Sequence, residues 1–243
     1  MAPEVSSAPV RRIIAWLADL VFPPHCGGCG RLGEWFCAAC VGQIGPPTPA
    51  GWACGGCTDR PWGRCRQPGC ADAPLAGLLV LGAFEGPLRE AIHAFKYGRQ
   101  RVLAPALARL LVGLLDVAPA PWGCATPVLL AVPLHRQRVR ERDFSQTATL
   151  ATALASRTGY SLLTGLVRTR HTPPQVGLQA ADRRANMVGA FAWSAGVRPP
   201  QRPVLLIDDV YTSGATMRAA AQALHEAGAG PVYGLALARP RTV

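Results

Sequence analysis

The sequence predicts an α/β protein in two parts: a small cysteine-rich domain, then a mostly parallel sheet with flanking helices. Two observations lead to this class. Eight of the nine cysteines lie between Cys26 and Cys70, where aliphatic residues are sparse. Beyond residue 75, short apolar runs alternate with segments of helical periodicity, as expected of strands joined by crossover helices.

Four apolar runs indicate strands, because continuous runs of this kind are typical of parallel strands buried on both faces. The predicted strands are residues 78–84, 128–132, 204–207 and 232–237. The predicted helices are residues 88–97, 103–115, 146–157 and 216–227. Ser145 is the expected N-cap of the third helix and Gly159 its expected C-cap.

The composition changes near residue 75, so we place a domain boundary between Ala71 and Gly77. The predicted organisation is residues 1–24 as an N-terminal helix and lead-in, 25–74 as the cysteine-rich domain and 75–243 as the α/β domain. Residues 168–186 are polar and contain two prolines. A loop of this length inside a compact domain is usually functional or disordered.

The chain has 243 residues, of which 49% are hydrophobic and 16% charged, which excludes a disordered, charge-solvated chain. No apolar run reaches the roughly 18 residues that cross a bilayer. The nearest candidate, residues 10–22, contains three charged side chains and lacks the small-residue cleavage site of a signal peptide. We therefore expect a cytoplasmic protein with no membrane insertion.

Basic residues outnumber acidic ones, and the formal net charge is +11. All but one of the 25 basic residues are arginine, whose planar fork suits phosphate oxygens. Polyanionic ligands such as nucleic acid, nucleotides or phosphorylated sugars fit this charge, but net charge alone does not distinguish them from simple solubility. The single lysine, Lys96, is read as a packing or edge residue with no catalytic role.

The cysteines follow a repeated spacing, Cys-x2-Cys-x7-Cys, with a fourth cysteine after each repeat. Two such turns supply the four thiolates of a tetrahedral zinc site, with no position open for catalysis. A disulfide framework is the alternative, disfavoured by the lack of a secretion signal. One or two structural Zn²⁺ ions are expected; sequential and interleaved pairing both stay open. The metal ligands are Cys26, Cys29, Cys37, Cys40, Cys54, Cys57, Cys65 and Cys70.

Residues 204–216 read Val-Leu-Leu-Ile-Asp-Asp-Val-Tyr-Thr-Ser-Gly-Ala-Thr: a buried strand, two carboxylates, a small-residue turn and a helix. The turn places amide and hydroxyl groups at a helix N-terminus, which is an anion site. Asp208 and Asp209 could accept hydrogen bonds from vicinal sugar hydroxyls or hold Mg²⁺ through water. A Walker loop is excluded because its Gly-Lys-Ser/Thr ending is absent, and the turn has no Gly-x-Gly-x-x-Gly.

This segment resembles the signature of type I phosphoribosyltransferases, which bind 5-phosphoribosyl 1-pyrophosphate (PRPP). Over nearly the whole chain the sequence is similar to the ComF family, which joins a double zinc ribbon to such a Rossmann-like domain. Further motifs carry the resemblance: residues 20–29, 91–97, 132–146 and 168–191. Asp143 and Ser145 depart from the usual Arg-Gly-Phe-Asn-Gln of the family's first loop.

The resemblance implies a role for each matching position. Asp208 and Asp209 would hold the ribose hydroxyls of PRPP and serve as the catalytic pair. The 5′-phosphate would lie on Thr212, Ser213, Gly214, Ala215 and Thr216. The pyrophosphate, with Mg²⁺, would meet Leu134, His135 and Arg136. A mobile loop would close over the ligand with Arg168, Arg170, Gln175 and Arg183.

Three functions are compatible with this resemblance. The first is phosphoribosyl transfer with displacement of pyrophosphate at the anomeric carbon. The second is a single-stranded DNA-binding role beside competence machinery, because similar proteins are linked to DNA uptake and natural transformation. The third is a PRPP sensor without turnover. The acceptor and the oligomeric state are not encoded in any motif that we recognise.

Overall fold

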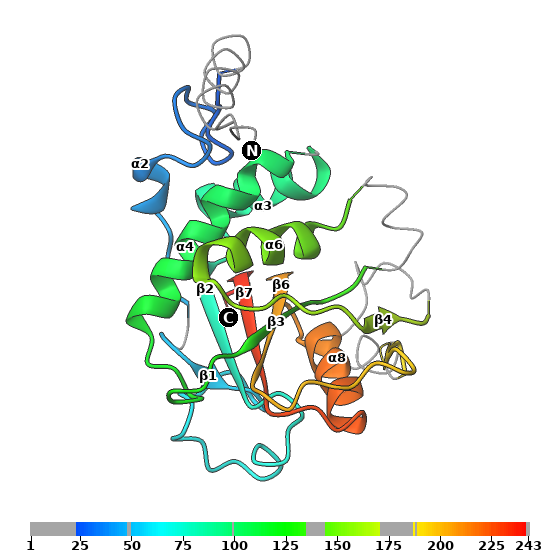
Figure 1. Ribbon diagram of the computed structural model, residues 1–243. Coiled ribbons are helices and arrows are strands. Elements are labelled where there is room, and N and C mark those ends of the chain that lie inside the picture. Colours follow the sequence, from blue (N-terminus) through cyan, green and yellow to red (C-terminus); the bar gives the residue numbers. More distant parts are fainter. Residues whose placement is uncertain are drawn as a thin grey trace, which may run out of the picture.

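The computed structural model describes residues 23–47, 50–98, 100–134, 144–170, 187 and 189–241. Its main sheet has five strands in the order β1-β2-β7-β6-β3 (Figure 1). Four of them run parallel, and only β1 is antiparallel to its neighbour β2. The strands are β1 (Ala53–Cys54), β2 (Gly77–Ala83), β3 (Val128–Ala131), β6 (Val204–Val210) and β7 (Val232–Arg239).

Helices cover both faces of this sheet, which confirms the predicted α/β class. The helices α3, α4 and α6 pack on one face, and α8 packs on the other (Figure 1). A two-stranded antiparallel sheet, β4 with β5, lies beside α8. These elements are α2 (Ala38–Val41), α3 (Gly86–Tyr97), η1 (Arg101–Leu103), α4 (Ala104–Val117), α6 (Gln146–Thr158), β4 (Leu166–Arg168), β5 (Phe191–Trp193) and α8 (Ala215–Glu226).

The core explains why the central strands read as unbroken apolar runs. Along β6, Leu205 and Ile207 face the α3, α4 and α6 side, while Val204 and Leu206 face α8. All four side chains are fully buried. Parallel strands covered by helices on both faces need this pattern.

Two predicted helix signals are confirmed at the ends of α6. The Ser145 side chain accepts a hydrogen bond from the Ala148 amide at 3.3 Å, as an N-cap does. Gly159 ends the helix with φ of 71°, a left-handed conformation that favours glycine.

Strand β6 is longer than the sequence predicted. The prediction ended it at Ile207, but pairing with β7 continues through Asp208 and Val210. Backbone pairing with the long strand β7 therefore outweighs the low strand propensity of aspartate. Both aspartates belong to the last part of the strand.

The cysteine-rich segment contacts the α/β part at several places in the described part of the chain. Strand β1, from this segment, pairs with β2 at the edge of the main sheet. Cys26, Phe36 and Cys40 belong to the core cluster beneath α3. The domain boundary between residues 71 and 77 stays a prediction.

Several predicted residues lie outside the described part of the chain: His135, Arg136, Asp143, Gln175 and Arg183. The same holds for most of the N-terminal lead-in, residues 1–24, and of the predicted mobile loop. Within the part that the structure does describe, none of the helices combines the length and apolarity that a bilayer crossing requires.

Candidate functional site

The aspartate pair lies at the carboxyl end of β6, where ligands bind in open α/β sheets. Asp209 is buried with 8% of its surface exposed, and Asp208 is half-buried. The Asp209 amide donates a hydrogen bond of 2.8 Å to Oδ1 of Asp208, which fixes the first carboxylate against its own backbone. The site therefore holds two adjacent carboxylates that are largely removed from water.

Lys96 forms an ion pair with this site. Its Nζ lies 2.6 Å from Oδ1 of Asp209, and both side chains are mostly buried, with 17% and 11% exposed. Lys96 lies in the last turn of α3, so this helix places the ammonium group beside the carboxyl end of β6. Sequence reasoning assigned Lys96 no role. The signal that could have found it was its chemistry, since every other basic residue in the chain is arginine.

The start of α6 holds Lys96 in place. Gln146 is fully buried, and its Nε2 donates to the Lys96 carbonyl at 3.1 Å. The next residue, Thr147, donates its hydroxyl hydrogen to the Val132 carbonyl at 2.7 Å, just past β3. Through these two bonds, the segment that resembles the family's first loop ties α3 and β3 to the same edge of the sheet.

Electrostatics at the pair act on the titration of Asp208. Burial and the neighbouring charge of Asp209 raise the pKa of Asp208 to about 7. Lys96, the Asp209 amide and Arg168 lower this pKa, but they do not offset burial. Asp208 can therefore gain or lose a proton near neutral pH.

The turn after β6 is built around a glycine. Gly214 has φ of 73°, and a Cβ at this position would overlap the Tyr211 hydroxyl. Gly214 directly precedes Ala215, the first residue of α8, so the backbone amides of the turn lie at the N-terminus of this helix. We call residues 212–216 the phosphate turn, because amides at a helix N-terminus favour anions.

Arg218 braces the phosphate turn from the first turn of α8. Its Nη1 donates to the Tyr211 hydroxyl at 2.7 Å, and its Nη2 donates to the Ser213 carbonyl. Tyr211 is buried, and burial raises its pKa, while Arg218 and the Thr58 side chain lower it. Arg218 therefore helps to hold the turn in its conformation.

The eight cysteines form two groups of four, paired sequentially: Cys26, Cys29, Cys37 and Cys40, then Cys54, Cys57, Cys65 and Cys70. We call these the first and the second cluster. Within each, the sulfur atoms all lie within 4.8 Å of one another.

The spacing of the sulfurs fits zinc rather than disulfides. The Sγ–Sγ distances are 3.6 Å for Cys26–Cys40 and 3.8 Å for Cys29–Cys37 in the first cluster. Tetrahedral zinc–sulfur bonds of about 2.3 Å would separate two sulfurs by about 3.8 Å. A disulfide needs about 2.05 Å. Both clusters are compatible with zinc binding.

Backbone amides at the clusters also favour thiolates. Burial alone would raise the pKa of Cys26, but amide hydrogen bonds from Cys37, Cys29 and Gly28 outweigh it and lower that pKa to about 6. In the second cluster, burial again acts upward, but amide bonds at Cys54 lower its pKa to about 7. Burial and neighbouring side chains raise the pKa of Cys40 and Cys57, so four thiolates in one cluster require a cation among them.

The sequence was compared with known proteins. It is 28% identical over 222 residues to Competence protein F of Haemophilus influenzae, covering 89% of this chain and 85% of that protein. It is 30% identical over 229 residues to DNA utilization protein YhgH of Salmonella typhi, covering 90% and 99%. It is 32% identical over 219 residues to the protein of that name in Escherichia coli O157:H7, covering 88% and 89%. The chain belongs to the ComF family.

No family model matches this ComF-family chain. Among solved structures it is similar to the allosteric regulatory enzyme of purine biosynthesis, with 22% identity and a TM-score of 0.37, over 56% of this chain and 25% of that one. It is also similar to glutamine PRPP amidotransferase from B. subtilis, with 21% identity and a TM-score of 0.34, over 57% and 26%. The ComF-family chain spans about a quarter of the length of these two chains.

Three other predicted site residues of the ComF-family chain are described. Leu134 is half-buried and follows β3, which pairs with β6, so it lies at the same edge as the aspartates. Arg168 ends β4, lies 5.5 Å from the centre of the Phe191 ring and influences the charge of Asp208. Arg170 is exposed two residues further on.

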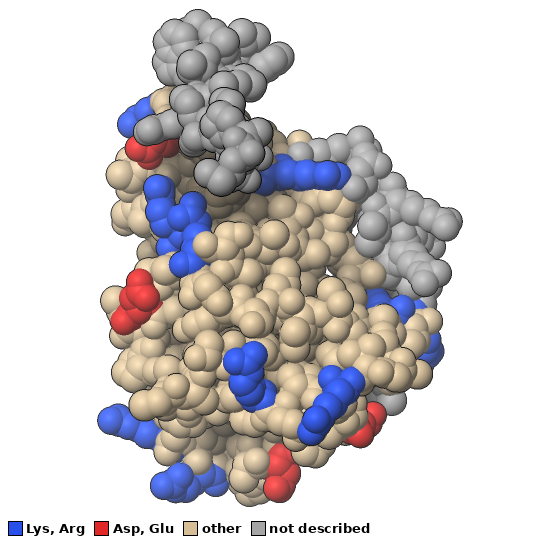
Figure 2. All heavy atoms as spheres, in the orientation of Figure 1, with Lys and Arg blue, Asp and Glu red and all other residues tan. Residues whose placement is uncertain are grey.

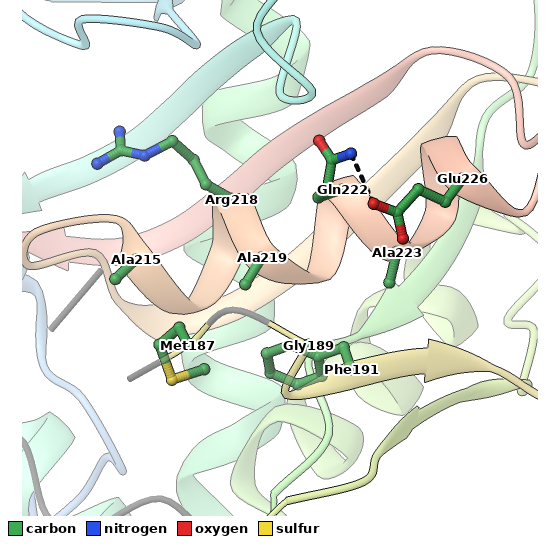
Figure 3. Close-up of a pocket in the computed structure, with 9 residues that line it drawn as sticks. All are labelled: Met187, Gly189, Phe191, Ala215, Arg218, Ala219, Gln222, Ala223 and Glu226. Atoms are coloured by element: carbon green, nitrogen blue, oxygen red, sulfur yellow. Dashed lines mark hydrogen bonds between the residues drawn. The ribbon is translucent and has the colours of Figure 1, made fainter. Parts of the chain in front are cut away.

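A cavity of about 410 Å³ lies between α8 and β5. Figure 3 shows Ala215, Ala219 and Ala223 along the α8 face that looks toward Met187 and Phe191. The cavity adjoins the start of α8, but neither aspartate lines it. It is therefore distinct from the aspartate pair.

Proposed function

We propose that this protein binds PRPP with Mg²⁺ at the carboxyl end of β6 and transfers the phosphoribosyl group to an acceptor, releasing pyrophosphate. One observation carries the proposal: Asp208 and Asp209 end a buried parallel strand and are followed at once by the Gly214 turn that opens α8. A diol-binding carboxylate pair beside an anion-binding helix N-terminus is matched to a ribose 5-phosphate.

Each part of the site would take one part of the ligand. Asp208 and Asp209 would accept hydrogen bonds from the two ribose hydroxyls, and the phosphate turn would hold the 5′-phosphate. Leu134, with His135 and Arg136, would meet the pyrophosphate. Arg168, Arg170, Gln175 and Arg183 would close over the ligand, exclude water and bring positive charge to the leaving group.

Lys96 would reduce the electrostatic repulsion within this arrangement. Two adjacent carboxylates repel each other, and a buried ammonium 2.6 Å from Asp209 offsets that repulsion. In the proposed complex, the Lys96 ammonium stays paired with Asp209, whose carboxylate accepts a hydrogen bond from a ribose hydroxyl.

Mg²⁺ would be shared between ligand and protein. Hard oxygen donors suit this ion, which is usually held by one or two carboxylates and substrate phosphates and keeps several waters. Asp208 and Asp209 offer such oxygens, and the ion would neutralise charge on the pyrophosphate. The transfer itself needs positioning and charge stabilisation more than covalent help from the protein.

Isothermal titration with PRPP tests the binding step. Heat of binding should require Mg²⁺ and should be lost when Asp208 and Asp209 are both changed to Asn. The matched control is Asp116→Asn, an exposed aspartate near the end of α4, which should bind as the wild type does. Binding that survives the double change would refute the proposed site.

A screen of acceptors for Mg²⁺-dependent pyrophosphate release then separates an enzyme from a sensor. Release with any purine, pyrimidine or amine acceptor supports phosphoribosyl transfer. PRPP binding without release from the whole panel would select the sensor.

We also propose that each cysteine cluster holds one structural Zn²⁺ ion. A segment of about fifty residues with few aliphatic side chains cannot be stabilised by a hydrophobic core alone, so metal binding would supply its folding free energy. A cytoplasmic location follows as part of this proposal, because reducing conditions keep the thiols free of disulfides.

A second role, in handling single-stranded DNA during uptake, is favoured by the names of the relatives and by the net charge of +11. On the face in Figure 2, however, Lys and Arg side chains are spread out rather than gathered in one groove. Fluorescence anisotropy with an oligonucleotide should show affinity that falls steeply with salt. Absence of binding at low salt would remove this role.

A further inference from the structure

The second cysteine cluster is linked to the phosphate turn through Thr58. Thr58 follows the ligand Cys57, and its amide donates to the Cys54 carbonyl at 2.8 Å, inside the metal-binding loop. Its side chain lies close enough to the Tyr211 hydroxyl to lower the pKa of that phenol, three residues before Gly214. Its carbonyl accepts a bond of 2.6 Å from Nη1 of Arg239, at the end of β7. One residue thus joins the metal loop to both central strands.

Thr58 has a backbone that needs support. Its φ is 64°, and no other non-glycine residue in the described part of the chain has a positive φ. A β-branched residue in this region is strained and keeps the conformation only when its surroundings hold it there. The loop closed by Cys54 and Cys57 is such a surrounding, and a metal ion bound by both would fix it.

From Tyr211 the link continues into the turn itself. The Tyr211 hydroxyl fills the space where a side chain at Gly214 would lie. It also accepts a hydrogen bond from Arg218, which in turn donates to the Ser213 carbonyl. Figure 3 shows Arg218 extending from α8 away from Met187 and Phe191. A shift of the Tyr211 ring would therefore disturb both the glycine and the carbonyl that shape the turn.

The first cluster has different neighbours. Its residues Cys26 and Cys40 pack into the core beneath α3, Gly28 lies against Pro87, and α2 lies beside α3. The two clusters share one spacing but support different parts of the α/β domain. This gives a matched comparison within one chain.

We propose that a metal ion in the second cluster holds the phosphate turn in shape, with Thr58 and Tyr211 as positioning residues. Loss of that ion frees Thr58 from its left-handed backbone, withdraws its hydroxyl from Tyr211 and loosens residues 212–216. Affinity for a phosphate group then depends on the loading of a metal site that never touches the ligand. The consequence for PRPP rests on the proposed function, whereas the effect on the turn does not.

Hydrogen exchange on the full-length protein tests the link without any ligand. Cys57→Ser and Cys29→Ser change equivalent positions of the two repeats, and metal content should fall by one ion in each. Amides in peptides covering 208–218, including Tyr211, which donates to Ala238 at 2.8 Å, should exchange roughly tenfold faster in Cys57→Ser. In Cys29→Ser they should exchange at the wild-type rate. Equal exchange in the two variants would overturn the proposal.

Thr58 provides a test that leaves both metal sites intact. Thr58→Val removes the hydroxyl and keeps the shape, whereas Thr58→Ser keeps the hydroxyl. Both should retain the wild-type metal content. Thr58→Val should speed exchange over residues 208–218 and weaken PRPP binding roughly three- to tenfold, the effect of losing one buried polar contact. Thr58→Ser should restore both.

The two proposals fail in different ways. If wild-type protein binds no PRPP, the proposed function fails, and exchange still decides whether the metal loop controls the turn. If wild-type protein binds PRPP but Thr58→Val matches it in affinity and exchange, the link is wrong and the binding site stands.

Discussion

Replacing Asp208 with Asn should stabilise the folded protein at pH 8 while removing the proposed affinity for PRPP. The pKa of this carboxyl is raised from 3.8 to about 7, mainly by burial and then by Asp209. Between these values the folded chain keeps a proton that the unfolded chain has lost. Its free energy of unfolding therefore falls as pH rises through this window.

The size of the effect follows from the shift. About 3 pKa units at 1.36 kcal/mol each correspond to at most about 4 kcal/mol above pH 7. An asparagine carries no such cost, and its amide oxygen can still accept the bond from the Asp209 amide, which is 2.8 Å in the wild type. The stability gap between the variant and the wild type should widen between pH 5 and pH 8 by at most about 3 kcal/mol.

Thermal unfolding followed by circular dichroism measures this gap. For a chain of this size, each kcal/mol moves Tm by roughly 2–4 °C. Asp116→Asn, the exposed control, should show no widening. Asp209→Asn should destabilise, because it leaves the mostly buried Lys96 ammonium without its 2.6 Å partner. A constant gap from pH 5 to pH 8 for Asp208→Asn would refute the inference that the ionised Asp208 carboxylate destabilises the folded protein.

Three further predictions use other parts of the structure. Lys96→Met removes a charge that lowers the pKa of Asp208, so the midpoint of Mg²⁺-dependent PRPP binding should move to higher pH in titrations from pH 6 to 9; an unchanged midpoint contradicts this. Gly214→Ala should lower Tm, because its φ is 73° and the new methyl overlaps Tyr211, whereas Gly113→Ala, in open space on α4, should add about 0.5–1 kcal/mol. A colorimetric assay after thiol modification should release two zinc ions per wild-type chain and one from Cys54→Ser; a single ion from the wild type would show that one cluster is empty.

Local signals made much of the fold predictable. The strands after residue 75 could be recognised because helices cover both sheet faces, so β6 is apolar up to Ile207 and most side chains of β7 are apolar. The repeated cysteine spacing was equally informative, since a metal loop is defined by a few consecutive residues. The structure then decided for sequential grouping over the interleaved alternative.

The contacts that complete the site could not be read in the same way. Lys96 and Asp209 are 113 positions apart, and only the docking of α3 across the sheet brings them together. Thr58 follows the ligand Cys57, and nothing in the local sequence indicates that its carbonyl accepts a hydrogen bond from Arg239, 181 positions away. Strand β1 is two residues long, below what periodicity can detect, and exists because β2 offers it an edge.

That short strand has a consequence for how the two parts of the chain can be separated. β2 carries apolar side chains along nearly its whole length, and Ala53 and Cys54 pair with part of its outer edge. A fragment beginning after residue 74 would leave this edge of β2 with unpaired backbone amides and carbonyls, which can pair with another copy of the fragment. The cysteine-rich segment thus covers part of a sheet edge, and we expect the α/β part, prepared alone, to self-associate more readily than the full chain.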